Sequence, residues 1–340
     1  MVGIVSYGFY IPKYRIRVED IAKNWSKDPA DVKKSLAVLE KAVSGQDEDT
    51  LTMAYESTQM ALTGLKFDKK QIKAVFVGSE SHPYVVNPTA TILAEFLGIN
   101  GEYLASDAQF ACKAATGAVI SGLGLIRSQF TNYCLVLASD KAQSLPHDAL
   151  EYTAASGSVS LLLGKDDLLV EAVDYTSFST DTPDFWRREG IRYPSHGGRF
   201  TGKPSYFYHI NGASQLLLKK LKLKPADFKY AVFHMPNGKF PIQIASSIGF
   251  SIDQITPSLV VTSLGNSYTA SALMGLVAVL DKAKSGDLIF FASFGSGAGS
   301  DAFVFKVTKN IHKRRRNLAV KMKDRKYIDY ATYLKFMEMI

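Results

Sequence analysis

The hydrophobic pattern is densest in one segment, where small or apolar residues occupy almost every position. This segment runs from Cys112 to about Arg127. A helix that is apolar on all sides is a buried helix, so the pattern predicts one here, followed by a buried strand at residues 133–139. Glycine weakens a helix relative to alanine. We therefore expect close backbone packing to compensate at Gly117, Gly122 and Gly124.

Elsewhere the pattern alternates between strand and helix periods. Strands are predicted at residues 3–10, 74–78, 157–163, 168–175, 231–234, 288–293 and 299–307. Helices are predicted at residues 14–44, 47–62, 87–97, 214–223, 242–248 and 266–283. Residues 178–210 are polar, aromatic and glycine-bearing. A loop of that length in a compact domain is usually functional.

The two halves of the chain repeat each other. Cys112 and Tyr133 are 21 positions apart, as are Asn266 and Asp287, and each pair spans a small-residue helix before a strand. An internal repeat points to two similar α/β halves, here residues 1–165 and 166–310. We expect the two small-residue helices to lie back to back at the centre, where loops from both halves converge.

Charge and composition exclude several classes of protein. Of the net charge of +8, residues 311–340 contribute nine Lys and Arg against three Asp and Glu, so the rest is near neutral and a nucleic-acid-binding body is not expected. Two cysteines provide neither a disulfide framework nor a metal cluster, which fits a reducing, cytoplasmic interior. The N-terminus lacks signal-peptide features, and no apolar run approaches the roughly 20 residues that span a bilayer.

Cys112 is the candidate nucleophile. It stands where a loop enters the predicted buried helix, and the unpaired N–H groups at a helix start favour an anion. Such a position is expected to lower the thiol pKa from about 8.5 toward neutrality. The alternative is that a cysteine is simply a small hydrophobic residue. That alternative fits Cys134, inside the predicted strand.

Three further residues occupy corresponding places after strands or before helices: Glu80, His234 and Asn266. A cysteine nucleophile needs a group that moves protons and donors that hold an oxyanion. Histidine and a desolvated glutamate suit the first task, and backbone N–H groups in the Gly-Ser-Gly turn around Ser296 suit the second. A structural histidine and a solvated glutamate remain alternatives. His82, His147, His209 and His312 are interpreted as structural, and His196 is undecided.

Taken together, several sequence strings resemble the thiolase superfamily and, within it, the archaeal-type hydroxymethylglutaryl-CoA synthases. The resemblance covers residues 1–308 and is carried by GSES, AQFACKAAT, LEYTAA, DFWRREG, RYPSHGGRFTG, HMPNGKFP, LGNSYTAS and SFGSGAGSD. It implies a duplicated fold with α-β-α-β-α layers. The chain differs from the family at residues 155–160, where the family has more Ala and Gly.

The resemblance assigns roles to individual residues. It implies an acyl-thioester at Cys112, a general acid/base at Glu80 and a catalytic histidine at His234. Further substrate or CoA contacts are implied for Asn266, Ser296, Thr153, Arg199, Thr201, Lys239, Asp28 and Pro29. The implied reaction condenses acetyl-CoA with acetoacetyl-CoA and water to give hydroxymethylglutaryl-CoA and CoA, in the mevalonate pathway, without a cofactor other than the CoA carrier.

Two alternatives to this reaction stay open. A β-ketoacyl-ACP synthase III-like enzyme would use the set Cys112, His234 and Asn266, but its decarboxylating condensation needs no carboxylate base such as Glu80. A non-catalytic scaffold of the same fold is the second alternative, and the intact set of three reactive side chains argues against it.

The C-terminal residues 311–340 combine a basic run with many aromatic side chains. An aromatic surface of this kind normally covers its own body or meets another chain. The resemblance favours a partner, because such synthases work beside an acetoacetyl-CoA thiolase and a small bridging protein. We therefore expect a docking tail outside the catalytic body, and a homo-oligomer.

Overall fold

One large sheet organises the molecule. The computed structural model describes residues 1–99 and 101–340. Nine strands hydrogen-bond in the order β11-β12-β13-β8-β1-β7-β6-β4-β5. Their bounds are β1 Gly3–Tyr10, β4 Ile72–Gly78, β5 Leu104–Ala108, β6 Tyr133–Lys141, β7 Ser156–Gly164, β8 Val170–Ser179, β11 Tyr230–Phe233, β12 Leu288–Ala292 and β13 Gly299–Val307.

The strand order repeats in the two halves of the chain. The first half runs β1-β7-β6-β4-β5 and the second β8-β13-β12-β11. In both, two antiparallel pairs are followed by a parallel one. The halves join where β1 pairs with β8 at Gly3 and Ile4. β4 and β11 therefore occupy equivalent places, and so do the residues that follow them.

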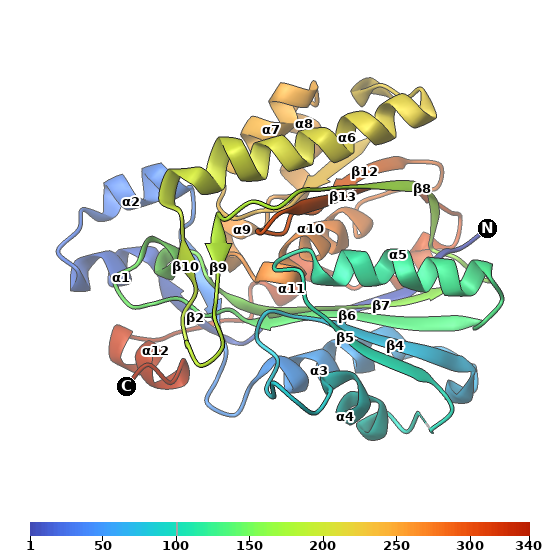
Figure 1. The fold of residues 1–340 in the computed structure, drawn as a ribbon, viewed down its shortest axis with the longest axis horizontal. Coiled ribbons are helices and arrows are strands. Elements are labelled where there is room, and N and C mark those ends of the chain that lie inside the picture. Colours follow the sequence, from blue (N-terminus) through green and yellow to red (C-terminus); the bar gives the residue numbers. More distant parts are fainter. Residues whose placement is uncertain (100) are drawn as a thin grey trace.

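Helices cover both sides of each half and fill the space between them (Figure 1). The bounds are α3 Thr50–Leu62, α4 Thr89–Phe96, α5 Ala114–Arg127, α6 Tyr208–Leu221, α7 Phe240–Ile248, α8 Ile252–Ile255, α9 Val261–Leu264 and α10 Ser271–Leu280. α3 and α4 lie outside the first half, α6 to α8 outside the second, and α5 and α10 between them. The two halves of the sheet thus form two β layers with helices between and outside them (Figure 1). This confirms the predicted thiolase-like α/β fold with five layers.

One predicted helix is wrong. Residues 14–44 form two strands and two helices, with the bounds β2 Tyr14–Arg17, α1 Val18–Asn24, α2 Pro29–Leu36 and β3 Glu40–Val43. Pro29 cannot continue α1, because it lacks the N–H that a helix interior needs, and it begins α2 instead. The side chain of Asp28 caps α2 by accepting from the N–H of Ala30 at 2.7 Å.

The three glycines of α5 differ in their surroundings. A Cβ on Gly122 would lie 2.8 Å from the sulfur of Cys134, so this glycine lets α5 pack directly on β6. A Cβ on Gly117 would come no closer than 4.0 Å to another group, and Gly124 has nothing within 4 Å. Close packing therefore explains Gly122, and the prediction is wrong for the other two.

The serine-rich strand β7 is stabilised by a buried hydroxyl cluster. The hydroxyl of Ser57 on α3 lies 2.8 Å from that of Ser158 and 2.6 Å from that of Ser160. Thr58 adds a contact of 2.9 Å to Ser160. Because these hydroxyl groups bond to one another, β7 can bury its serine side chains.

Residues 178–210 and the tail both fold onto the body. The first contain the short hairpin β9 (Phe185–Trp186) and β10 (Ser195–His196), which leads through η3 (Gly198–Thr201) and η4 (Gly202–Phe207) into α6. The tail contains α11 (Leu318–Lys321), β14 (Lys326–Tyr327) and α12 (Tyr330–Phe336).

The tail is part of the folded body. β14 pairs with β2, and the side chains of Leu318 and Tyr333 are each 1% exposed within the main core. The prediction that the tail stands apart from the catalytic body is therefore wrong. Among the described helices, none is long and apolar enough to cross a membrane.

Candidate active site

The equivalent loops of the two halves bring four predicted residues to one region. Glu80 follows β4 and His234 follows β11, so they stand at matching strand ends. Cys112 lies two residues before α5, and Asn266 precedes the turn that begins α10. The N–H of Ala115 donates to the hydroxyl of Thr269 at 3.2 Å, which ties the two helix starts together.

A cavity of about 270 Å³ opens at this meeting point. Its lining includes six of the residues that the sequence singled out, namely Cys112, Thr153, Thr201, His234, Asn266 and Ser296. Apolar and aromatic side chains complete much of it, among them Leu36, Phe185, Tyr206, Phe240, Tyr268 and Phe294. A mostly apolar cavity with a few convergent polar groups is typical of a small-molecule site.

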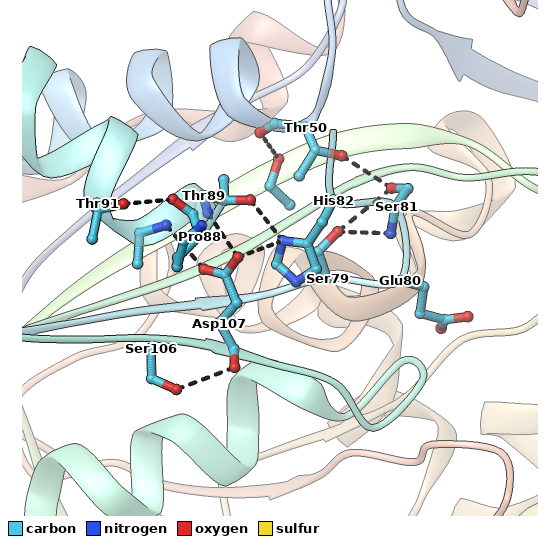
Figure 2. A network of polar contacts seen from close by, with 12 residues as sticks. Thr50, Ser79, Glu80, Ser81, His82, Pro88, Thr89, Thr91, Ser106 and Asp107 are labelled. Carbon is cyan, nitrogen blue, oxygen red and sulfur yellow. Dashed lines mark hydrogen bonds and ion pairs between the residues drawn. The ribbon is translucent and has the colours of Figure 1, made fainter. Parts of the chain in front are cut away.

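Glu80 lies behind Cys112, outside the lining of this cavity. It borders a smaller space of about 20 Å³ that shares Phe185 and Tyr268 with the main one. The backbone N–H of Glu80 donates to Asp140 at 2.8 Å, and the hydroxyls of Ser79 and Ser81 donate to the same carboxylate oxygen at 2.7 Å each. Figure 2 shows the Glu80 side chain pointing away from the serines and His82 that flank it.

The thiol of Cys112 and the carboxyl of Glu80 each shift the pKa of the other. Burial, reinforced by the charge of Asp140, raises the pKa of Glu80 to about 8. Burial and the neighbouring Glu80 carboxylate raise the pKa of Cys112 well above its usual value. The predicted lowering of the Cys112 pKa is therefore wrong, because desolvation and a neighbouring carboxylate outweigh the helix start.

His234 is a neutral imidazole at neutral pH. It is buried, and burial lowers its pKa to about 3. Its carbonyl accepts a hydrogen bond of 2.6 Å from the hydroxyl of the fully buried Tyr206, which fixes the backbone beside the ring. A neutral imidazole donates one N–H and accepts at the other nitrogen, so it can polarise a carbonyl or move a proton.

The hairpin β9–β10 and the segment that follows it cover the cavity. They contribute Phe185, His196, Gly198 and Thr201 to the lining. His196, undecided from the sequence, lies 3.1 Å from each carboxylate oxygen of Asp148. Arg187, next to β9, donates to the carbonyl of Glu80 at 2.8 Å. The hairpin is therefore held at two places, through Arg187 at Glu80 and through His196 at Asp148.

The remaining predicted contacts lie outside the lining. Arg199 and Lys239 are exposed, and each is adjacent in sequence to a lining residue. Asp28 and Pro29 lie at the start of α2, whereas it is Leu36, at the other end of this helix, that lines the cavity. The structure thus places the two cations near the cavity and does not bring Asp28 or Pro29 into it.

The Gly-Ser-Gly turn lies at the cavity, with part of its hydrogen-bonding capacity already used. Gly295 donates its N–H to the carbonyl of Gly299 at 2.9 Å, and Gly297 donates to Asp184 at 2.7 Å. Asp184 is fully buried and also accepts from the hydroxyl of Ser205. This carboxylate holds the turn in place, with Ser296 between the two bonded glycines.

Sequence reasoning missed Asp140, the buried carboxylate that holds the Glu80 backbone. It also accepts from the N–H of Thr269 at 3.0 Å, so one side chain links the loops of both halves. A carboxylate at the end of a buried strand was the signal that could have found it. Tyr268 was missed because an isolated tyrosine gives no such signal, whereas Tyr206 belongs to residues 178–210, which were predicted to be functional.

The other histidines behave as expected of structural residues where they are buried. His82 lies 2.8 Å from the hydroxyl of Thr89 and 3.4 Å from the carboxylate of Asp107. Figure 2 marks both contacts by dashed lines. His209 bonds to the carbonyl of Ser205 and the hydroxyl of Thr180. Among the described residues, no group of three or more His, Cys, Asp and Glu side chains could hold a metal ion.

Comparison with known proteins decides the family. The hydroxymethylglutaryl-CoA synthase of Methanosarcina acetivorans is 51% identical over 98% of this chain and 97% of that relative. The enzyme of the same name from Methanocaldococcus jannaschii is 49% identical over 100% of this chain and 99% of its own. The chain belongs to the hydroxymethylglutaryl-CoA synthase family.

More distant comparisons agree with the fold of this family. The solved structure of MvaS in complex with 3-hydroxy-3-methylglutaryl coenzyme A has a TM-score of 0.91 and 22% identity, covering 99% of this chain and 91% of that one. A hydroxymethylglutaryl-CoA synthase complexed with CoA has a TM-score of 0.87 and 24% identity, covering 98% and 89%. Residues 218–307 match the family model 3-oxoacyl-[acyl-carrier-protein] synthase III C terminal. That match covers part of the second half of the chain.

Proposed function

We propose that this chain condenses acetyl-CoA with acetoacetyl-CoA and water to form 3-hydroxy-3-methylglutaryl-CoA and free CoA. The observation that carries the proposal is the juxtaposition of Cys112 with Glu80 behind it and His234 and Asn266 in the same cavity. The identity of about half to curated synthases over the whole chain supports it. A β-ketoacyl-ACP synthase would not need the carboxylate at Glu80.

In the first step, Cys112 takes the acetyl group. The thiol holds its proton at neutral pH, since burial and the Glu80 carboxylate raise its pKa. Glu80 accepts that proton as the sulfur attacks the thioester carbonyl and delivers it to the departing CoA sulfur. The N–H groups of Cys112 and Ser296 are our candidates for holding the oxyanion, because Gly295 and Gly297 already use theirs.

In the second step, the Glu80 carboxylate removes a proton from the methyl group of the acetyl thioester. The resulting carbon nucleophile attacks the ketone of acetoacetyl-CoA, and the alkoxide that forms takes up the proton now held by Glu80. Neutral His234 donates its N–H to that ketone oxygen, with Asn266 assisting. Water then cleaves the thioester at Cys112, which regains its proton and releases the product.

We further propose that the exposed cations Arg199 and Lys239 contact CoA phosphates at the cavity rim. Thr153 and Thr201 line the cavity, and we assign them to the part that takes the acyl group. Contacts from Asp28 and Pro29 stay predictions of the resemblance. CoA is the carrier of both substrates, and the proposal includes no other cofactor.

The cellular setting is also a proposal. We infer a homo-oligomer that works in the cytoplasm beside an acetoacetyl-CoA thiolase and a small bridging protein. Co-purification of the full-length chain with these two partners tests the assembly, and elution of each protein alone in size-exclusion chromatography would contradict it.

The reaction itself is tested by mixing the purified protein with both CoA esters and following free thiol and product by mass spectrometry. Product formation with one CoA released per molecule of product supports the proposal. Formation of an acetyl adduct without any carbon–carbon bond would contradict it.

A further inference from the structure

A buried carboxylate, Glu151, joins the C-terminal tail to the wall of the cavity. Glu151 is fully buried in the 3₁₀ helix η2 (Ala149–Tyr152), and Ala149, Leu150 and Thr153 around it line the cavity. Its Oε1 atom accepts a hydrogen bond of 2.7 Å from the hydroxyl of Tyr330 on α12. A buried charge is stable only when its hydrogen bonds are made, so the tail hydroxyl stabilises η2 directly.

The other carboxylate oxygen of Glu151 is held from the body itself. Its Oε2 atom accepts from the indole N–H of Trp25 at 2.9 Å and from the backbone N–H of His147 at 2.8 Å. The Trp25 ring also stacks on the His147 ring, with centroids 4.3 Å apart. Glu151 is therefore held from α1, from its own loop and from α12.

A second link to the tail passes through Lys41. This side chain is 1% exposed, donates to the backbone carbonyl of Glu151 and lies 3.0 Å from the hydroxyl of Tyr333. Burial lowers the pKa of Lys41 to about 7. We call Trp25, Lys41, Glu151, Tyr330 and Tyr333 the Glu151 cluster.

The Glu151 cluster lies directly behind Asn266. The N–H of Asn266 donates to the carbonyl of Thr153 at 2.7 Å, and the N–H of Ala155 donates to the carbonyl of Asn266 at 2.9 Å. Gly265 packs against Lys41 so closely that a Cβ on the glycine would lie 2.7 Å from the Cβ of Lys41. The position of residues 149–155 therefore sets the backbone position of Asn266.

The end of α12 contacts two more parts of the cavity surroundings. Arg192, in the loop between β9 and β10, donates to the carbonyl of Met337 at 2.9 Å. Lys141, at the end of β6, pairs with Glu338 at 3.1 Å. Figure 1 shows α12 at the same end of the molecule as α1 and the β9–β10 hairpin.

We propose that α12 is a positioning element of the active site, which acts through the Glu151 cluster on residues 149–155 and Asn266. The tail then contributes to catalysis from within its own chain, whatever partner it meets. The kinetic part of this inference rests on the proposed condensation.

The test is Tyr330→Phe, which removes the hydroxyl that donates to Glu151 and keeps the ring. We expect kcat/KM for condensation to fall by between tenfold and a hundredfold, as is typical of a small displacement of a catalytic group (about 10²-fold for ~1 Å). Acetylation of Cys112 is expected to change less, because Asn266 is assigned to the second substrate. Assays are run well below the melting temperature of the variant.

The matched control is Asp281→Asn. Asp281 accepts from the N–H groups of Arg316, Asn317 and Leu318, so it holds the tail at the end of α10 remote from Asn266. This variant is expected to lower stability without changing the ratio of condensation to acetylation. Equal kinetic losses in Asp281→Asn and Tyr330→Phe would overturn the inference, since loosening the tail anywhere would then suffice.

Two further measurements separate positioning from general stability. Adding Glu151→Gln to Tyr330→Phe is expected to cost less than the sum of the two single effects, because both alter one contact. Amide hydrogen exchange in residues 149–155 is expected to speed up in Tyr330→Phe but not in Asp281→Asn. The exchange measurement does not depend on the reaction, so it still decides the inference if the proposed condensation fails. Unchanged exchange there would contradict the inference.

Discussion

The thiol of Cys112 and the carboxyl of Glu80 lie next to each other in the fold. They share one buried space at the centre of the proposed chemistry. Burial and the charge of Asp140 raise the pKa of Glu80 to about 8, although its hydrogen bond with Cys112 acts in the opposite direction. Burial and the Glu80 carboxylate in turn raise the pKa of Cys112, so the cysteine stays protonated. Glu80 can therefore act as proton acceptor and proton donor within one catalytic cycle at neutral pH. Burial and the Glu80 carboxylate therefore influence the protonation state of Cys112 more strongly than the helix start beside it does.

The pKa of Glu80 makes a prediction about pH. Its carboxylate is the active form in methyl-proton removal, so condensation is expected to rise with pH through about 8. Glu80→Gln is expected to remove that inflection and to lower condensation by at least about a hundredfold, while some acetyl adduct still forms. The rate of condensation from pH 6 to 9, measured in both proteins, checks this. An unchanged inflection in the variant would assign it to another group.

The same shift affects stability in a defined direction. The folded pKa of Glu80 is raised from 4.5 to about 8, so the native protein prefers the protonated form. The contribution of this group to stability is full below its unfolded pKa and is lost as pH rises through about 8. Denaturant titrations at pH 5 and pH 8.5 are expected to show a smaller loss for Glu80→Gln than for the wild type. An equal loss would refute the raised pKa.

Arg199 tests the assignment of the cavity rim. Arg199→Ala is expected to raise the KM for a CoA ester by about tenfold with little change in kcat, since an exposed phosphate contact is worth about 1–2 kcal/mol. Lys219→Ala, an exposed cation near the C-terminal end of α6, is the control. An unchanged KM for Arg199→Ala would exclude a phosphate contact there.

At the scale of elements, the sequence predicts most strands, the central helices and the places of the reactive residues. These follow from buried apolar runs and from the repeat between the halves, which sets Glu80 opposite His234. The pattern fails at residues 14–44, because a charged, mixed segment carries no clear period and the break at Pro29 has to be noticed separately. It also cannot give the pKa of Cys112, which depends on a carboxylate 32 positions away in the sequence.

Partners distant in the sequence explain the remaining misses. Asp140 binds the Glu80 backbone and Thr269, and Glu151 binds Tyr330, contacts that only the folded chain creates. The aromatic side chains of the tail predict a buried surface, but the sequence alone does not show whether they cover this protein or a partner. In the structure these side chains pack against the protein's own core.

The packing of α5 on β6 gives a prediction at this scale. Gly122→Ala is expected to destabilise the protein by about 1–2 kcal/mol, because the clash with the Cys134 sulfur exceeds the gain in helix propensity of about 1 kcal/mol. Gly124→Ala, with nothing within 4 Å of its Cβ, is expected to be neutral or stabilising. Urea unfolding of the two variants checks this, and equal effects would contradict the packing argument.

At the scale of the whole molecule, the repeat of the two halves explains why the residues of the proposed chemistry meet at one place, in and beside a single cavity. Each half supplies a strand-end residue, Glu80 or His234, and a helix-start residue, Cys112 or Asn266. The tail then closes the arrangement from behind, by contacts with η2 and with the loop between β9 and β10. Neither half alone contains both the proposed nucleophile and the groups proposed to act on the second substrate.

The central claim is that an acetyl group held on Cys112 is joined to acetoacetyl-CoA in this cavity. The most direct measurement is mass spectrometry of the protein after isotopically labelled acetyl-CoA is added, before and after a chase with unlabelled acetoacetyl-CoA. We expect the label to appear on the peptide that contains Cys112, and then to leave it and appear in 3-hydroxy-3-methylglutaryl-CoA. Cys112→Ala is expected to show neither event. Label on Cys134, or product formed by Cys112→Ala at the wild-type rate, would contradict the account.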